Sequence, residues 1–297
     1  IIWAIEGLTN IVISCFRQFV PNRRSVTGSN KGIGFAIVQA LCQKFKGVVY
    51  LTARDESRGK AAVAELNKLN LKPEFHQLDI TCKKSIVKFA DFIKIKHGGL
   101  DVLVNNAAIA YKNAATEPFS EQAEVSVAVN YLALVDVCEA LFPLLRPHAR
   151  VVHISSSAGH LLRIPSTQIQ ERLKDPSLTV ERLSELMQEF VKSAAEGKNK
   201  EQGWGQSAYA VSKVGVTALT RIQQRQFDTD PRPGITVNAV HPGYVATDMS
   251  SHKGNLTIEQ GADVPVHMAL WPVEEKAPRG QYVWNDRRIV SWTEPMN

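Results

Sequence analysis

The stretch TGSNKGIG, residues 27–34, decides the fold that this sequence predicts. Its glycines follow the pattern T-G-x-x-x-G-x-G and stand before a helical pattern over residues 35–45, whose apolar side carries Ile37, Val38 and Leu41. Glycines let the backbone turn tightly and approach a pyrophosphate, which then lies at the positive end of the helix. A glycine-rich surface loop would show the same bare pattern, so the neighbouring residues decide between the two readings.

A strand pattern over residues 48–52 follows at the distance expected of a βαβ unit and runs into Ala53, Arg54 and Asp55. An NAD site would place a carboxylate here for the ribose 2′-hydroxyl. Arg54, with Arg58 nearby and Lys31 in the glycine stretch, instead offers positive charge to a 2′-phosphate. Each of these residues alone could be a solvated surface charge, but together they predict NADPH as the cofactor.

Strand and helix patterns then alternate along the chain. Further strands are predicted over residues 75–80, 100–104, 151–154 and 235–240, and further helices over residues 85–96 and 122–145. Strict alternation predicts an α/β fold: a Rossmann-type, doubly wound parallel sheet with helices on both faces and ligands at the carboxyl ends of the strands. We expect one domain over residues 22–297.

The segment YAVSK places Tyr209 and Lys213 four residues apart in a helical pattern over residues 207–220. Positions four apart share one face of a helix, so the phenol and the ammonium group meet. A neighbouring ammonium lowers the pKa of a phenol, which can then exchange a proton with an alcohol or a developing alkoxide. Taken alone, the pair is also an ordinary amphipathic one with its lysine in water.

These motifs together resemble the short-chain dehydrogenase/reductase family. The resemblance rests on TGSNKGIG, NNA at residues 105–107, Asn130, Ser155 with Ser156, and YAVSK. Further stretches, LTARD, FHQLDI, GGLDVLVNNA, QAEV, GW shortly before SAY, and GQYV, are similar to the monomeric NADPH-dependent carbonyl reductases of the cytosol. The resemblance covers roughly residues 26–292. It implies NADPH-dependent reduction of aldehydes, ketones and quinones to alcohols.

The resemblance also implies roles for individual residues. Ser156 would donate a hydrogen bond to the substrate carbonyl, and Tyr209 would supply the proton. Lys213 would hold the nicotinamide ribose and lower the Tyr209 pKa. Asn130 would fix a water linked to Lys213. Tyr244 and Gln122 would contact substrate. The expected NADP(H) contacts are Gly28, Asn30, Lys31, Gly32, Ile33, Gly34, Arg54, Arg58, Asp79, Ile80, Asn106, Ala107, Tyr209, Lys213, Pro242, Gly243, Val245 and Thr247. Ser155 and Ser157 are read as ordinary turn serines and His241 as a packing residue of its loop; no G-x-S-x-G elbow supports a hydrolase triad.

An insertion over about residues 161–203 separates Ser156 from Tyr209. Thr179 can cap a helix whose apolar stripe includes Leu183, Met187 and Phe190, with Gly197 as its stop. Such a stripe must be buried against the domain. By resemblance to the carbonyl reductases, the insertion covers the surface through which other family members form tetramers, so we expect a monomer.

Composition excludes several classes of function. The formal charge of +6 suits an anionic ligand, but the basic residues are scattered, which argues against nucleic acid. Four well-separated cysteines without metal-ligand spacing indicate a reduced, cytoplasmic protein with no structural metal. Residues 1–21 form an apolar, amphipathic segment that is too interrupted to span a bilayer. It could lie on a membrane or on another protein, pack on this domain, or be foreign to it.

Two departures from the family pattern concern the cofactor half. The residues expected to form the first strand are Asn22, Arg23, Arg24, Ser25 and Val26, although a central parallel strand should be apolar. Either the preceding segment replaces native sequence or the strand is short and supported in another way. In addition, Ala108 stands where the family has glycine, which would weaken cofactor binding if that position needs a positive φ. Two rival functions stay open. The amphipathic start suggests a membrane-associated retinol or steroid dehydrogenase of the same family, and the polar first strand suggests a non-catalytic NADPH sensor.

Overall fold

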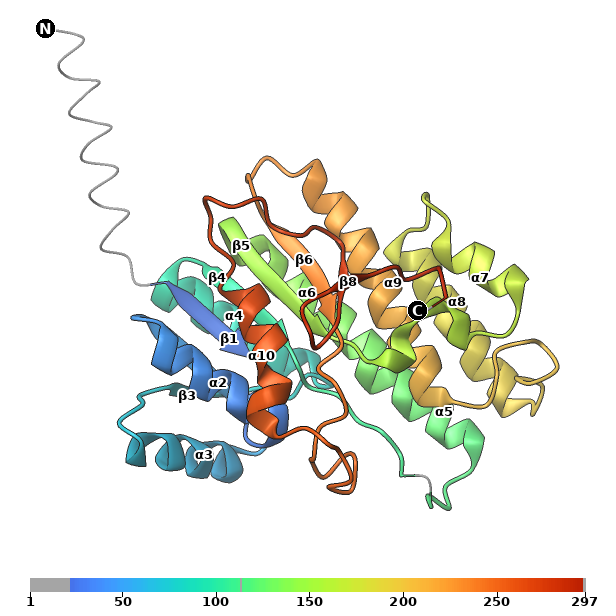
Figure 1. Ribbon diagram of the computed structural model, residues 1–297, viewed down its shortest axis with the longest axis horizontal. Coiled ribbons are helices and arrows are strands. Elements are labelled where there is room, and N and C mark those ends of the chain that lie inside the picture. The colour runs from blue at the N-terminus through green and yellow to red at the C-terminus, as the bar shows by residue number, and fades with distance from the viewer. Residues whose placement is uncertain (1–21, 113, 296–297) are drawn as a thin grey trace, which may run out of the picture.

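The protein forms one eight-stranded sheet with helices on both faces (Figure 1). The computed structural model describes residues 22–112 and 114–295, so the amphipathic segment predicted over residues 1–21 lies outside the described residues. The strand order is β3-β2-β1-β4-β5-β6-β7-β8. Their bounds are β1 Arg23–Val26, β2 Val48–Ala53, β3 Glu74–Gln77, β4 Leu100–Asn105, β5 Leu145–Ile154, β6 Thr236–Val240, β7 Tyr282–Val283 and β8 Ile289–Val290. Every neighbouring pair is parallel except β7 with β8.

Two layers of helices enclose this sheet, as the doubly wound prediction requires. One layer contains α2 (Gly32–Lys44), α3 (Glu56–Lys68) and α10 (Ile258–Ala269), and the other contains α4 (Lys83–His97), α6 (Ala133–Leu141) and α9 (Ala208–Asp228). The predicted α/β fold is confirmed. The ends of some elements differ from the predicted ranges. β3 ends at Gln77, before the predicted residue 80, because its partner β2 ends at Ala53, opposite Gln77.

The polar first strand is present and central. β1 is only four residues long, pairs with β2 on one side and β4 on the other, and is buried throughout. The Arg23 amide and side chain are held by Asp101 (2.7 Å) and His97 (3.0 Å). The Arg24 guanidinium lies 3.5 Å from the centre of the Phe45 ring. The strand is therefore short and contacted by residues outside it, as one of the two alternatives states. The other alternative concerns residues 1–21, which lie outside the described residues.

The helix predicted over residues 122–145 is longer and is interrupted. It comprises α5 (Phe119–Val127), a π-helical turn η1 (Ala128–Leu132), α6 and a final 3₁₀ turn η2 (Phe142–Leu144). Of the described helices, this run alone is long and apolar enough to cross a membrane, and 56% of its most apolar window is buried inside the domain. A core helix has the same composition. The wide turn at η1 carries Asn130, and such π turns are frequent at functional sites.

A 3₁₀ turn, η3 (Ser157–Gly159), precedes the insertion. The insertion itself folds as a second 3₁₀ turn, η4 (Leu161–Arg163), followed by α7 (Thr167–Lys174) and α8 (Val180–Ala195). The Thr179 side chain accepts the Arg182 amide at 3.2 Å and caps α8. Gly197, with φ +69°, ends it through a bond to the Ala194 carbonyl. The buried stripe of α8 packs against α5 and α9, as the sequence predicts.

Candidate active site

A cleft of ≈ 770 Å³ opens at the carboxyl edge of the sheet. Its walls come from the start of α2, the loop after β4, α5, the end of β5 with the residues after it, the loop after β6 and the first turns of α9. Ligands of open parallel sheets bind in this position because the loops after neighbouring strands diverge there. The cleft brings together Ser156, Tyr209 and Lys213, which are far apart in the sequence.

The start of α9 sets the positions of Tyr209 and Lys213. Ser207 caps the helix by accepting the Ala210 amide at 3.1 Å, which places Tyr209 in the first turn. Lys213 follows one turn later and is only 3% exposed. Its Nζ lies 5.7 Å from the centre of the Tyr209 ring and donates to the Ile154 carbonyl at 2.7 Å. The helix thus aims both side chains at the end of β5.

Burial controls the protonation of this pair. It lowers the pKa of Lys213 to about 8, so the amine is still mostly charged at neutral pH. Burial also raises the pKa of Tyr209, and the facing hydroxyl of Ser156 opposes that rise only in part. The Lys213 ammonium is directed to a carbonyl of β5, and the phenol loses its hydration by burial. The expectation that Lys213 lowers the Tyr209 pKa stays a prediction.

Ser156 begins the short turn η3 directly after β5. Its Oγ accepts the Ala158 amide at 3.2 Å, which leaves its O–H able to donate into the cleft. The neighbouring Ser155 is not the simple turn serine that the sequence suggests. It is buried, and its Oγ lies 2.8 Å from Thr217 Oγ1 on α9. Ser155 therefore joins the segment after β5, which carries Ser156, to α9, the helix of Tyr209 and Lys213.

Asn130 uses its amide to connect three segments. Its Oδ1 accepts the Ile109 amide at 2.8 Å, and its Nδ2 donates to the Ile109 carbonyl and to Ser212 Oγ, each at 3.0 Å. Ser212 in turn donates to the Tyr209 carbonyl at 2.8 Å. Sequence reasoning missed Ser212, although its place three residues after Tyr209 on a helix was a usable signal. The water expected between Asn130 and Lys213 stays a prediction.

The glycine-rich loop is held by the residues that follow β4. Gly28 and Gly32 both have φ +59°, the left-handed conformation that glycine adopts without strain. Asn106 Nδ2 donates to the carbonyls of Thr27 (2.9 Å) and Gly28 (3.0 Å). A Cβ on Gly34 would lie only 2.4 Å from that same nitrogen. The hydroxyl of Thr27 accepts the amides of Asn106 and Ala107, a role that the sequence did not reveal.

The loop fits the phosphates of a dinucleotide. α2 begins at Gly32 with no side-chain cap on its first amides and no acidic residue in its first turn. Its positive end is therefore available to an anion. Arg54 and Arg58 are exposed at the end of β2, where a 2′-phosphate would lie, and Arg58 Nε is 3.3 Å from Asp55. The residues present thus fit NADPH.

Lys31 is paired with Asp248 in this structure, and its expected place beside Arg54 and Arg58 stays a prediction. Its Nζ lies 2.5 Å from Asp248 Oδ2, in the loop after β6. Both side chains are more than half exposed, so this ion pair contributes little to stability and leaves Lys31 able to turn elsewhere.

All the predicted cofactor residues fall into two groups, those that line the cleft and those that do not. Those that line the cleft are Ile33, Asn106, Tyr209, Lys213, Pro242, Gly243, Val245 and Thr247. Those outside its lining are Gly28, Asn30, Lys31, Gly32, Gly34, Arg54, Arg58, Asp79, Ile80 and Ala107. The Asp79 carboxylate is engaged by Thr81. Ala108 also lines the cleft, and its φ is not positive, so its methyl group adds no backbone strain.

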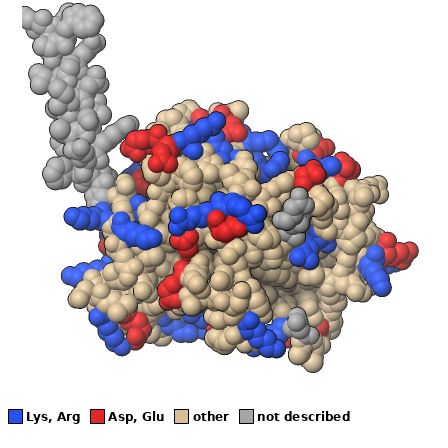
Figure 2. All heavy atoms as spheres, viewed as in Figure 1, with Lys and Arg blue, Asp and Glu red and all other residues tan. Residues whose placement is uncertain are grey.

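Both predicted substrate contacts outside the catalytic group line the cleft. Tyr244 is 54% exposed, and Gln122 donates to the Glu117 carbonyl at 2.9 Å. The lining also contains Lys112 and Lys253 but no Asp or Glu among the described residues. On the face drawn in Figure 2, basic and acidic side chains are interspersed rather than gathered into one patch. Within residues 22–112 and 114–295, no group of three His, Cys, Asp or Glu residues is placed to hold a metal.

The similarity of this chain to known proteins extends over most of its length. The family model described as short chain dehydrogenase matches residues 24–167 and 190–256. Carbonyl reductase (NADPH) 1 of Bos taurus is 46% identical over 270 residues, covering 90% of this chain and 97% of the relative. Carbonyl reductase (NADPH) 3 of Rattus norvegicus is 47% identical over 269 residues, with the same coverage. Among solved structures, salutaridine reductase from Papaver somniferum is 33% identical with a TM-score of 0.80, covering 88% of this chain and 99% of that one.

Proposed function

Because the chain belongs to the short chain dehydrogenase family, we propose that it reduces carbonyl groups of small molecules to alcohols with NADPH. The observation that carries the proposal is the cleft in which Ser156, Tyr209 and Lys213 meet beside the glycine-rich loop. The relatives named as NADPH carbonyl reductases match nine tenths of the chain. Neither a membrane-associated dehydrogenase nor a non-catalytic sensor is favoured by these relatives.

The site residues have complementary proposed roles. Bound NADPH supplies a hydride to the carbonyl carbon. The Ser156 hydroxyl donates a hydrogen bond to the carbonyl oxygen and stabilises the charge that develops there. Tyr209 gives its phenolic proton to the same oxygen, and its raised pKa keeps that proton in place at neutral pH until it is needed. Lys213 is held by the Ile154 carbonyl through one hydrogen, which leaves two for the ribose hydroxyls of the cofactor.

Substitution of Tyr209 tests the catalytic role. The wild-type chain should oxidise NADPH in the presence of menadione, a quinone, followed by the loss of NADPH absorbance. Tyr209→Phe removes only the hydroxyl, so NADPH binding measured by fluorescence should stay near the wild-type value while turnover is lost. A Tyr209→Phe enzyme with wild-type turnover would refute the mechanism. No turnover in the wild type, with binding intact, would refute the proposed activity on quinones.

The cofactor preference is tested at the end of β2. Arg54→Asp replaces the charge that we assign to the 2′-phosphate by one that repels it, so the preference should shift from NADPH toward NADH. Arg182→Asp, on the exposed face of α8, makes the same change in net charge far from β2 and serves as the matched control. An equal cofactor ratio in both variants would contradict the assignment.

The proposed assembly state is a monomer located in the cytosol. α8 covers α5 and α9 with its apolar stripe, which supports the proposal that these helices are not available to a second copy. Analytical ultracentrifugation should give a single species of about the chain mass, 32.9 kDa. A stable tetramer would refute the proposal.

A further inference from the structure

Ser156 lies on a short irregular segment that has little structure of its own. This segment, residues 155–161, is called the serine loop below. It consists of the two residues that follow β5, the single turn η3, His160 and the first residue of η4. Catalysis by a hydroxyl donor needs a position accurate to a fraction of an ångström. Within the loop, the Gly159 amide donates to the Ser156 carbonyl at 2.8 Å and the Ala158 amide to Ser156 Oγ at 3.2 Å. These two bonds shape a single turn, so contacts from elsewhere in the chain must hold that turn in place.

The first of these contacts comes from β7. The Tyr282 hydroxyl donates a hydrogen bond to the carbonyl oxygen of Ser156. Tyr282 is buried, and burial raises the pKa of its phenol, so it keeps the proton that it donates. Tyr282 thus holds the backbone of the very residue whose side chain faces Tyr209.

A second group of contacts comes from the residues after β8. Trp292 Nε1 donates to the Gly159 carbonyl at 2.8 Å, and the Trp292 carbonyl accepts the Leu161 amide at 3.1 Å. His160 Nε2 donates to the Ser291 carbonyl at 3.1 Å. Gly159 has no room to move toward α9, because a Cβ there would lie 2.3 Å from Ser155 Oγ and 2.9 Å from the Lys213 carbonyl. The serine loop is therefore fixed between Trp292 and the helix that carries Lys213.

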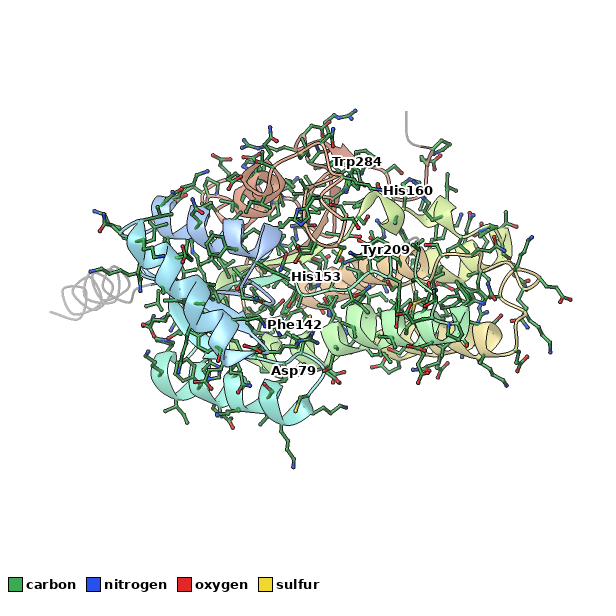
Figure 3. The ribbon with its side chains drawn as sticks, turned by 90° about the horizontal axis from the view of Figure 1, so that it is seen from below. Asp79, Phe142, His153, His160, Tyr209 and Trp284 are labelled. Carbon is green, nitrogen blue, oxygen red and sulfur yellow. The ribbon has the colours of Figure 1, made fainter. Side chains whose placement is uncertain are left out.

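A third contact passes through His241. Its Nδ1 accepts the Ser157 amide at 3.0 Å, and burial lowers its pKa to about 4, so this nitrogen is unprotonated at neutral pH. The His241 amide donates to the Val283 carbonyl at 2.8 Å, and its ring packs edge-to-face on Trp284 with centroids 4.9 Å apart. In Figure 3, Trp284 and His160 lie toward the side of the molecule that holds Tyr209, whereas Asp79 lies at the opposite edge.

We infer that Tyr282 and Trp292 are positioning residues for Ser156, so that the C-terminal residues 281–293 act in the reaction although none of them lines the cleft. Tyr282 holds the carbonyl of Ser156, and Trp292 holds the loop three to five residues later. Loss of either contact lets the Ser156 hydroxyl leave the line between the carbonyl oxygen and Tyr209. The inference rests on the proposed function where turnover is measured. Its second measurement, the exchange of backbone amides in the serine loop, rests on the structure alone.

The test uses Tyr282→Phe, which removes one hydroxyl and keeps the ring, and Trp292→Phe as a second variant. With menadione, kcat of Tyr282→Phe should fall by roughly ten-fold while the NADPH dissociation constant is unchanged. The isotope effect with deuterated NADPH should rise, because hydride transfer then limits turnover. Backbone amides of residues 157–161 should exchange with solvent faster in both variants.

Tyr50→Phe is the matched control. It also removes a buried phenolic hydroxyl, bonded to Glu74 at 3.1 Å, but on β2 and away from the cleft. It should lower stability and leave both kcat and the exchange of residues 157–161 at wild-type values. Equal kcat and equal amide exchange in Tyr282→Phe and wild type would overturn the inference. A wild type without turnover would overturn the proposed function instead, and amide exchange would still decide whether Tyr282 fixes the loop.

Discussion

Replacing Arg24 by leucine should make this protein more stable. Arg24 lies in the centre of the sheet, opposite Val49 on β2 and Val102 on β4, and is 7% exposed. Its Nε and one terminal nitrogen have no hydrogen-bond partner within the described part of the chain. A buried charge without such partners loses its hydration and is not compensated. Strands at this position normally carry apolar residues.

The magnitude follows from the pKa of the guanidinium. Burial lowers it from 12.5 to about 10, which corresponds to a cost of about 3 kcal/mol at neutral pH. The sign is that of a cation disfavoured by the fold: the cost is complete below pH 10 and fades as the pH rises toward 12.5. The stack on Phe45 offsets about 1 to 2 kcal/mol of it. Leucine removes the cost, loses the stack and keeps apolar contacts, so Arg24→Leu should gain about 1 to 2 kcal/mol.

Urea denaturation at neutral pH measures this effect. The midpoint should rise with an unchanged slope, since the fold and the surface exposed on unfolding are the same. Arg24→Met, which fills more of the space of the arginine stem, should behave similarly. Arg182→Leu on the exposed face of α8 is the control and should change stability by less than about 0.5 kcal/mol. A loss of stability in both Arg24 variants would refute the reasoning and would mean that the guanidinium is compensated in the folded protein.

Three further predictions concern the site and its surroundings. Burial lowers the Lys213 pKa from 10.5 to about 8, so the charged lysine lowers the stability of the folded protein by about 3 kcal/mol below pH 8. Lys213→Met should therefore unfold at a higher urea concentration although it loses turnover, and an unchanged urea midpoint would contradict this. His153 is buried between Asn105 and Gln223, and burial lowers its pKa from 6.5 to about 4. The stability of the folded protein should therefore fall by about 3 kcal/mol as the pH drops from 6.5 to 4, because the unfolded chain takes up the proton first. His153→Asn should remove that share of the acid sensitivity in urea titrations at several pH values, and equal sensitivity in the variant would show that other groups cause it. Gly34→Ala should lower stability by about 1 to 3 kcal/mol and weaken NADPH binding measured by fluorescence, because the added Cβ would displace Asn106 from the glycine-rich loop. Unchanged NADPH binding would count against that contact.

The helical insertion shows how far a local pattern reaches. Thr179, Gly197 and the apolar stripe between them predict α8 correctly, because a cap, a stop and a helical period are all read within one segment. The same pattern does not say which surface the stripe covers. That surface is formed by α5 and α9, which come from other parts of the chain.

The first strand shows the opposite case. Its composition argues against a central position, yet β1 pairs on both sides as the fold requires. The backbone hydrogen bonds of a parallel sheet do not depend on side chains, and Phe45, His97 and Asp101 cover the two arginines. A strand propensity counts only the residues of the strand and omits such distant partners.

The sequence by itself determined the fold class, the family and the identity of the groups that meet in the cleft, because these depend on motifs whose spacing is local. It also determined which residue types offer a proton, a hydroxyl and an ammonium group. Only the tertiary structure decided how these groups are held and charged. Lys213 bonds to Ile154, burial raises the Tyr209 pKa, and Tyr282 and Trp292 reach Ser156 from the far end of the chain. Desolvation and long-range hydrogen bonds arise from packing between distant segments, and no local pattern contains them.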